Sequence, residues 1–179
     1  MKIKSLMSCA LSAVVLLAAA SVHAAPDLTG TWVLDRSQSQ FHQPDAADGT
    51  GRHGRKGGHR EGAGRGEVKL IVAEDGNALK VTRAMAKKGT ERTFTETYLL
   101  DGTEQTSKGR RGTAVTKALY DGDRLLVNTS YTMTTKDGDK AMSRASVWTV
   151  SPDGQTLTIE TTMQSPRGER QMKTVYQKG

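Results

Sequence analysis

The sequence predicts an all-β protein in which an antiparallel meander closes into an up-and-down barrel of about eight or nine strands. Short runs of alternating apolar and polar residues recur after Glu67, and five Asp-Gly dipeptides stand between or beside them. Alternation gives a strand one apolar face, and Asp-Gly tolerates the positive φ angles of tight hairpin turns. Threonine, which favours strands, occurs 22 times. Closure removes the exposed edges of such a sheet, and a strongly curved, half-open sheet is the alternative.

Residues 1–24 are typical of a secretory signal peptide. Lys2 and Lys4 precede an apolar run, Leu11–Ala20, and small residues then stand at the positions that a signal peptidase reads. An uncleaved N-terminal anchor is the alternative. Cleavage leaves one domain, 25–179, without the lone cysteine and with no remaining transmembrane segment, so thiol chemistry is excluded. We expect a periplasmic or secreted protein.

The mature chain supplies nine predicted strands. A short turn or helix around Ser37–Phe41 should follow the first of them, and a Gly-rich stretch should separate the first from the second. Asp-Gly pairs punctuate most of the later connections. The predicted strands are Gly30–Asp35, Val68–Glu74, Leu79–Ala84, Thr93–Leu100, Thr113–Tyr120, Leu125–Met133, Met142–Val150, Thr156–Met163 and Gln171–Gln177.

The segment 43–66 differs in composition from the rest of the chain. It contains eight glycines and no aromatic residue, so we expect a mobile loop that cannot offset its ordering entropy by burial. One interpretation is a solvated linker. The other is a site for polyanions such as lipopolysaccharide, anionic lipid or another envelope surface, without specific nucleic-acid binding. Its basic residues are Arg52, Arg55, Lys56, Arg60 and Arg65.

Two stretches resemble a group of bacterial secreted lipocalin-like proteins. One is the opening strand, Leu28 to Asp35, with its Gly-Thr-Trp motif, and the other is the late hairpin from Val147 to Ile159, with Ser-Pro-Asp-Gly. The resemblance implies a small exported lipocalin-like barrel and leaves the activity open. In lipocalins the tryptophan of this motif packs against a basic residue of a late strand. The resemblance therefore implies structural roles for Gly30 and Trp32, with Arg170 or Lys173 as the cation.

Catalytic and metal sites receive little support. The sequence carries no nucleophile elbow, no paired zinc-protease histidines and no phosphate loop before a helix. His53 and His59 are weak metal candidates, because their spacing fits no standard zinc site and their surroundings are cationic. We therefore expect a protein that is not an enzyme and that holds no cofactor and no metal.

The barrel interior is the remaining candidate site. Phe94 and Tyr98 share one strand face by parity, as do Arg144 and Trp148, and Tyr131 is a further large aromatic residue on a strand. If these faces point inward, they either fill the core or line a cavity for a small apolar or amphipathic ligand. Ligand binding in the barrel is our first functional hypothesis, and binding of anionic surfaces through the loop is the alternative. Only the second should weaken steeply with salt.

Overall fold

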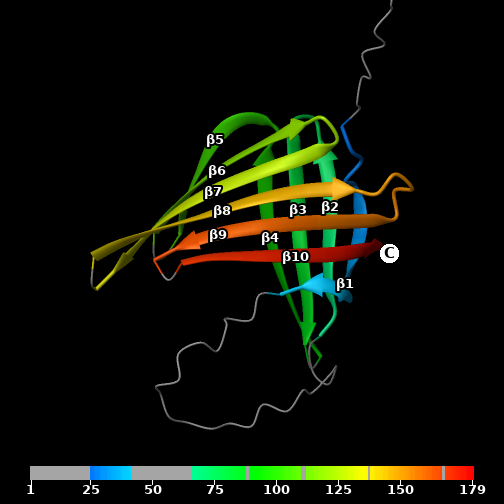
Figure 1. The fold of residues 1–179 in the computed structure, drawn as a ribbon, viewed down its shortest axis with the longest axis horizontal. Helices are drawn as coiled ribbons and strands as arrows, with labels where there is room; N and C mark the ends of the chain where they lie inside the picture. Colours follow the sequence, from blue (N-terminus) through cyan, green and yellow to red (C-terminus); the bar gives the residue numbers. More distant parts are fainter. Residues whose placement is uncertain (1–24, 42–65, 88, 110–111, 137, 167) are drawn as a thin grey trace, which may run out of the picture.

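The computed structural model describes residues 25–41, 66–87, 89–109, 112–136, 138–166 and 168–179, and these residues form ten strands (Figure 1). The short connections between consecutive strands from β2 to β10 make this an antiparallel meander. The strands are β1 (Gly30–Gln40), β2 (Val68–Asp75), β3 (Ala78–Lys87), β4 (Thr90–Leu99), β5 (Asp101–Gly109), β6 (Gly112–Asp121), β7 (Arg124–Thr135), β8 (Gly138–Val150), β9 (Thr156–Ser165) and β10 (Gly168–Lys178).

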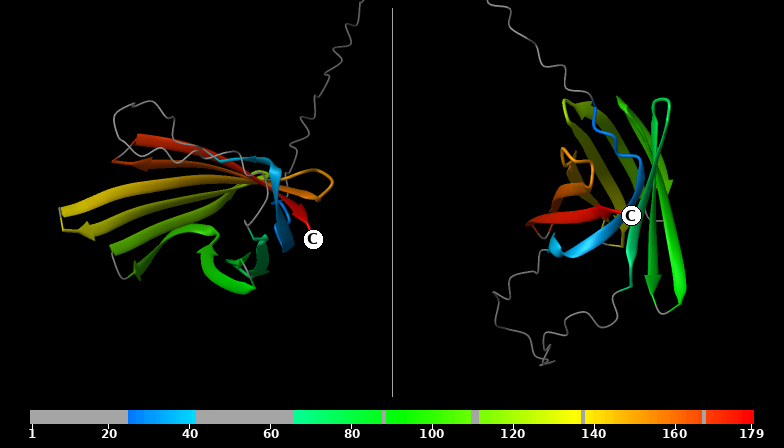
Figure 2. Two further views of the ribbon diagram at one scale, coloured as in Figure 1. Left: turned by 90° about the horizontal axis from the view of Figure 1, so that it is seen from below. Right: turned by 90° about the vertical axis from the view of Figure 1, so that its right-hand side faces the viewer.

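A single sheet curls around until the barrel is nearly closed. Its strand order is β4-β3-β2-β1-β10-β9-β8-β7-β6-β5, and β1 pairs antiparallel with β10. The sheet therefore has two edges, β4 and β5, which leave a seam in the wall (Figure 2). Across this seam the Leu99 N–H donates to the Gln105 side-chain Oε1 at 2.9 Å. The predicted all-β meander is confirmed, with ten strands in place of eight or nine.

Two predictions about the strands were wrong. The strand β5 was not expected, because its residues are polar, mostly exposed, and show no alternation of apolar and polar types. The expected turn at Ser37–Phe41 is instead the second half of β1, which continues to Gln40 through a register shift after Asp35. The Asp35 carboxylate accepts from the N–H and hydroxyl of Ser37, which kinks the strand without ending it. The Val175 N–H then donates to Ser39 Oγ and fastens the kinked part to β10.

The Asp-Gly dipeptides mostly serve as predicted. Gly76 and Gly122 turn the β2–β3 and β6–β7 hairpins with φ angles of 59° and 61°, which favour glycine. Gly154 plays the same part between β8 and β9 with φ of 69°. The pair at Asp101 differs, because it begins β5 at the seam and does not join two paired strands.

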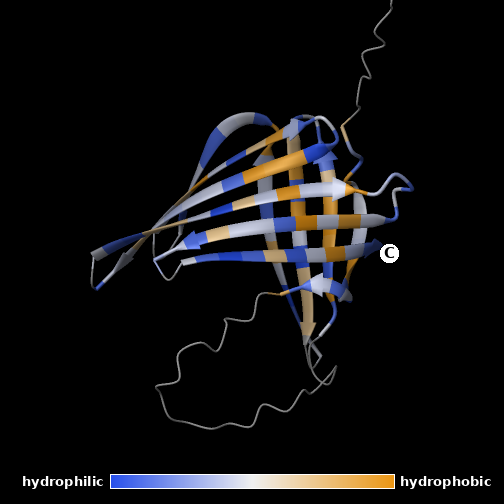
Figure 3. Ribbon diagram, viewed as in Figure 1, coloured by the Kyte–Doolittle hydropathy of each residue, from blue (hydrophilic) through white to orange (hydrophobic). Residues whose placement is uncertain are grey.

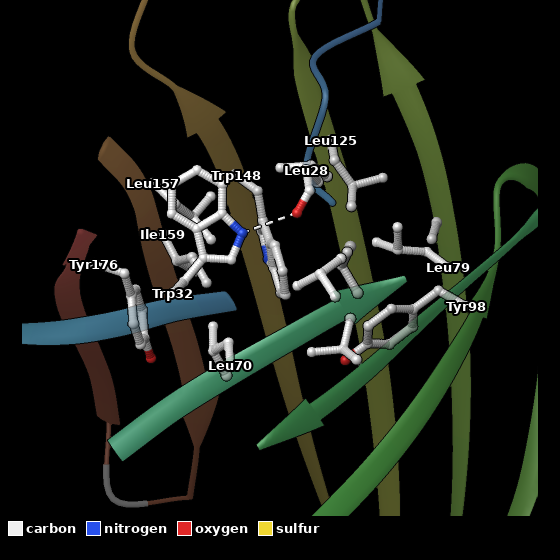
Figure 4. Close-up of a cluster of buried hydrophobic side chains, with 14 residues drawn as sticks. Leu28, Trp32, Leu70, Leu79, Tyr98, Leu125, Trp148, Leu157, Ile159 and Tyr176 are labelled. Atoms are coloured by element: carbon white, nitrogen blue, oxygen red, sulfur yellow. Dashed lines mark hydrogen bonds between the residues drawn. The ribbon is translucent and has the colours of Figure 1, made fainter. Parts of the chain in front are cut away.

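The apolar core fills one end of the barrel, which we name the closed end. Figure 3 shows the apolar residues gathered at the end of the barrel where the chain's C-terminus lies, while the far tips of the β7–β8 and β9–β10 hairpins are hydrophilic. Figure 4 shows their side chains meeting between strands from opposite walls. The residues with no exposed surface include Leu28, Trp32, Leu70, Leu79, Leu125 and Leu157.

Trp32 of β1 contacts both the segment that precedes β1 and the last strand, β10. Its indole Nε1 donates to the Leu28 carbonyl at 2.9 Å (Figure 4), and the Lys178 ammonium lies 5.2 Å from its ring centroid. Lys178 is the register partner of Trp32, so the cation comes from the last strand, as expected. The choice of Arg170 or Lys173 was wrong, because the register carries Arg170 to the opposite end of β10, opposite Met163.

Candidate functional site

The open half of the barrel encloses a cavity of about 660 Å³. Its walls come from eight strands, β1 to β4 and β7 to β10, with every strand contributing residues of its inward face. Cross-strand pairs such as Val81 with Glu96 and Trp148 with Ile159 confirm that these side chains share one face, because directly opposed residues point the same way. The cavity is thus a consequence of the period-2 pattern in a curved sheet.

Burial decreases steadily from the floor of the cavity to its mouth. The floor consists of Tyr98, Val127, Trp148, Ile159 and Tyr176, each at most 6% exposed. Towards the other end the lining becomes partly or largely exposed, and Phe94 reaches 56%. We name the exposed lining residues the mouth: Arg36, Phe41, Arg83, Phe94 and Glu96, together with the half-buried Met85, Met142 and Met163.

All five predicted ligand-contact residues line this cavity: Phe94, Tyr98, Tyr131, Arg144 and Trp148. The alternative that the predicted aromatic side chains fill the interior does not describe this structure, because a cavity remains and, of these four, only Tyr98 and Trp148 are buried in its floor. Their rings meet edge to face at 6.4 Å with an interplanar angle of 79°. That these residues contact a ligand remains a prediction.

Four methionines and two further arginines line the cavity and were not predicted. Met85, Met142, Met163 and Met172 supply flexible, polarizable walls that can adapt to irregular apolar molecules. The arginines are Arg36 and Arg83. The alternation of Val81, Arg83 and Met85 along β3 could have identified the cavity-lining residues of this strand, because the buried Val81 fixes which face points inward.

A small polar cluster crosses the cavity wall between β4 and β8. The Tyr98 hydroxyl donates to Glu96 Oε2, and Arg144 Nη2 lies 3.8 Å from the same oxygen. The Arg144 guanidinium also lies 6.0 Å from the ring centroid of Tyr131. Burial, followed by the negative charge of Glu96, raises the pKa of the Tyr98 hydroxyl well above its usual range.

Two buried donors beside the cavity have no hydrogen-bond acceptor among the described residues. They are Arg144 Nε and Trp148 Nε1. Both residues belong to β8 and point to the same face, with Ser146 between them. Ser146 is itself satisfied, because its hydroxyl shares a hydrogen bond with Thr161 at 3.1 Å. The polar atoms of β8 are therefore incompletely paired. Each buried donor without an acceptor costs about 1–3 kcal/mol.

The predicted loop sites lie outside the described residues. This holds for the polyanion candidates Arg52, Arg55, Lys56, Arg60 and Arg65 and for the weak metal candidates His53 and His59. The flanks of the stretch are described, and both lie at the mouth: Phe41 lines the cavity, and the Gly66 carbonyl accepts from Arg36 Nη2 at 2.9 Å. Within the described ranges, no three His, Cys, Asp or Glu residues form a group that could hold a metal.

No helix in the described part of the chain is long and apolar enough to cross a membrane.

Comparisons with known proteins give a fold and no family. No protein-family model matches the chain, and no curated protein matches it. Among solved structures, the chain is similar to a secretory abundant heat soluble protein from Ramazzottius varieornatus. The TM-score is 0.52 at 14% identity, over 89% of this chain and 100% of that one.

Two further structures match with lower scores. The zebrafish ileal bile acid-binding protein complexed with cholic acid gives a TM-score of 0.48 at 13% identity, over 84% of this chain and 98% of that one. Human cRBP IV gives 0.48 at 14% identity, over 86% and 98%. The topology and the likeness to the heat-soluble protein confirm the lipocalin-like barrel.

Proposed function

We propose that this protein is a non-enzymatic binding protein that takes a small apolar or amphipathic molecule into its barrel. The observation that carries the proposal is the cavity of about 660 Å³ above a packed floor. Its volume falls within the range of about 300–1,000 Å³ that is usual for small-molecule sites, and its lining has the usual mixture of apolar walls and a few convergent polar groups.

The chemistry of the lining favours binding over catalysis. Within the described residues, the cavity wall carries no histidine, no cysteine and one carboxylate, Glu96. That carboxylate already accepts from Tyr98 and lies near Arg144. Among the described lining residues, no serine, threonine or cysteine is hydrogen-bonded to a histidine or a carboxylate, which is the pairing on which many acyl-transfer and hydrolytic sites depend.

A fluorescent apolar probe, 1-N-phenylnaphthylamine, tests the proposal by titration into the purified protein. Thr161→Trp should lower the affinity at least tenfold, because Thr161 lines the cavity and the larger ring fills it. Thr158→Trp is the matched control, since Thr158 lies three residues away on the same strand, on the opposite face by parity, and does not line the cavity. Far-ultraviolet circular dichroism confirms that both variants are folded. If the probe does not bind, or binds equally to both variants, the proposal fails.

Export belongs to this proposal as well. We infer that residues 1–24 are removed and that the mature chain begins at Ala25 in the periplasm or outside the cell. The support is the charged and apolar pattern of the first 24 residues. Native mass spectrometry of the exported protein tests both points, because it gives the mature mass and any small molecule that stays bound. A mass that still includes residues 1–24 would contradict cleavage.

A second candidate function is binding of anionic envelope surfaces through 43–66. One observation favours it: the described flanks of this stretch, Phe41 and Gly66, both lie at the cavity mouth. Deletion of residues 51–65 should abolish salt-sensitive binding to anionic vesicles and leave binding of the apolar probe intact. Unchanged vesicle binding at low salt would refute this function.

A further inference from the structure

Basic side chains are concentrated on the inner face of the open half of the barrel. Arg83 and Arg144 line the cavity itself, as does Arg36. Other basic residues follow on the same face just beyond the lining, since each is the register partner of an inward methionine or stands two residues from one. The six residues are Arg36, Arg83, Arg92, Lys140, Arg144 and Arg170.

This concentration is a segregation of charge. Across the described ranges the chain carries fifteen Lys or Arg residues and fifteen Asp or Glu residues, so it is balanced. On the open half of the inner face, however, Glu96 is the one acidic residue among those described. The excess of positive charge in a concave, partly apolar space produces a positive potential that is stronger than on a flat surface, because low-dielectric walls focus the field.

The two innermost arginines are poorly neutralised. Arg144 reaches Glu96 at 3.8 Å, which is long for an ion pair, and its Nε has no acceptor among the described residues. Arg83 lies opposite Phe94 and makes no ion pair within the described part of the chain. Both guanidinium groups therefore retain donors for an additional anion at the mouth.

We infer that the ligand is an amphiphile with an anionic head, such as a carboxylate or a phosphate monoester, whose head lies between Arg83 and Arg144 and whose apolar tail points towards Trp148. The inference rests on the proposed function, because it names the ligand class of the same cavity. Guanidinium groups bind carboxylate and phosphate through charge-assisted hydrogen bonds. The polarity gradient sets the orientation, since the floor is apolar and buried whereas the charges stand at the mouth.

The experiment compares four 12-carbon probes that share one tail: dodecyl phosphate, dodecanoate, dodecanol and dodecyltrimethylammonium. Each displaces 1-N-phenylnaphthylamine from the full mature chain, below its micelle concentration. We expect dodecyl phosphate and dodecanoate to bind at least tenfold more tightly than dodecanol, and the cation to bind most weakly. Salt should weaken binding of the two anions and leave dodecanol unaffected.

Two variants locate the head. Arg83→Gln and Arg144→Gln should each weaken dodecyl phosphate about tenfold, because each removes a charge-assisted contact, and should leave dodecanol unchanged. Lys80→Gln is the matched control, since it removes one positive charge from the outer face of the same strand as Arg83. Arg83 is exposed, so its variant is expected to fold and is sufficient for the test if Arg144→Gln does not.

The outcomes separate the two levels of the proposal. If dodecanol or the cation binds as tightly as the anions, the inferred head group is wrong and the cavity still binds apolar molecules. If no probe displaces the dye and the dye itself does not bind, the proposed function fails. If inorganic phosphate displaces dodecyl phosphate at the same concentration, the mouth is a site for free anions and the amphiphile is refuted.

Discussion

The two tryptophans offer a direct test of how the closed end is stabilised. Both are buried, with Trp32 at 0% and Trp148 at 5% exposure. They differ in their indole donors: Trp32 Nε1 donates to the Leu28 carbonyl at 2.9 Å, whereas Trp148 Nε1 has no acceptor among the described residues. The substitution of each by Phe removes one indole donor and a similar volume, so the two variants differ mainly in the hydrogen bond that Trp32 makes.

For Trp32→Phe the losses add up. The hydrogen bond contributes about 1 kcal/mol, and the buried Leu28 carbonyl left without a donor costs about 1–2 kcal/mol more. The smaller ring leaves a void worth about 1 kcal/mol and weakens the contact with Lys178, which contributes about 0.5–1 kcal/mol. We expect the free energy of unfolding to fall by about 3–5 kcal/mol.

For Trp148→Phe the void costs about the same, but the substitution also removes an unpaired buried donor, which offsets about 1 kcal/mol or more. The net loss should be about 0–1 kcal/mol. Urea unfolding followed by far-ultraviolet circular dichroism measures both variants, because tryptophan fluorescence itself changes. A difference between the two variants of less than about 1 kcal/mol would refute the reasoning, since the indole hydrogen bond would then contribute nothing measurable.

Three further predictions concern other parts of the barrel. Burial and the charge of Glu96 raise the pKa of Tyr98. The free energy of unfolding that this group contributes should therefore be fully present below the ordinary tyrosine pKa of 10.0 and should be lost as the pH rises above it. Tyr98→Phe should flatten that loss in urea titrations. Gly112→Ala should prevent normal pairing of β6 with β7, because φ is 153° and the added Cβ would lie 1.9 Å from the Thr132 carbonyl oxygen; the thermal midpoint should fall sharply. Glu96→Gln should tighten dodecyl phosphate several-fold in the dye-displacement assay, because it frees Arg144 from a competing carboxylate.

The sequence predicted the cavity-lining faces better than the ends of the strands. Alternation fixes the relative orientation of residues two apart, so Phe94 and Tyr98 were placed together, as were Arg144 and Trp148, before any register was known. Pattern alone could not decide that these faces point inward. That required the curvature of the sheet and the buried partners opposite them, such as Ile159 opposite Trp148.

The wrong predictions concern a strand without an apolar face and a side-chain contact that depends on strand register. β5 pairs with β6 through backbone groups, and its exposed polar side chains give no apolar signal. The cation on Trp32 depends on the pairing of β1 with β10, which joins residues about 140 positions apart, so Lys178 could not be chosen over Arg170 from local sequence. The charge segregation of the inner face was missed for the same reason, since it becomes visible only once eight strands are aligned.

The pairing of β1 with β10 has a consequence for how the chain could be rearranged. The strands follow one another in the sheet in chain order, except that the sheet begins and ends between β4 and β5 and that β10 pairs with β1. The Gly179 N–H donates to the Thr31 carbonyl at 2.9 Å, so Gly179 lies beside the first strand. A circular permutant that links this end to Asp27 and begins at Asp101, in the seam, would have only sequence-adjacent strands as neighbours. Its contact order would be lower, and such chains fold faster. In the natural order, the pairing of β1 with β10 is the one pairing among the described strands that joins strands distant in sequence, and it lies beside the buried Trp32.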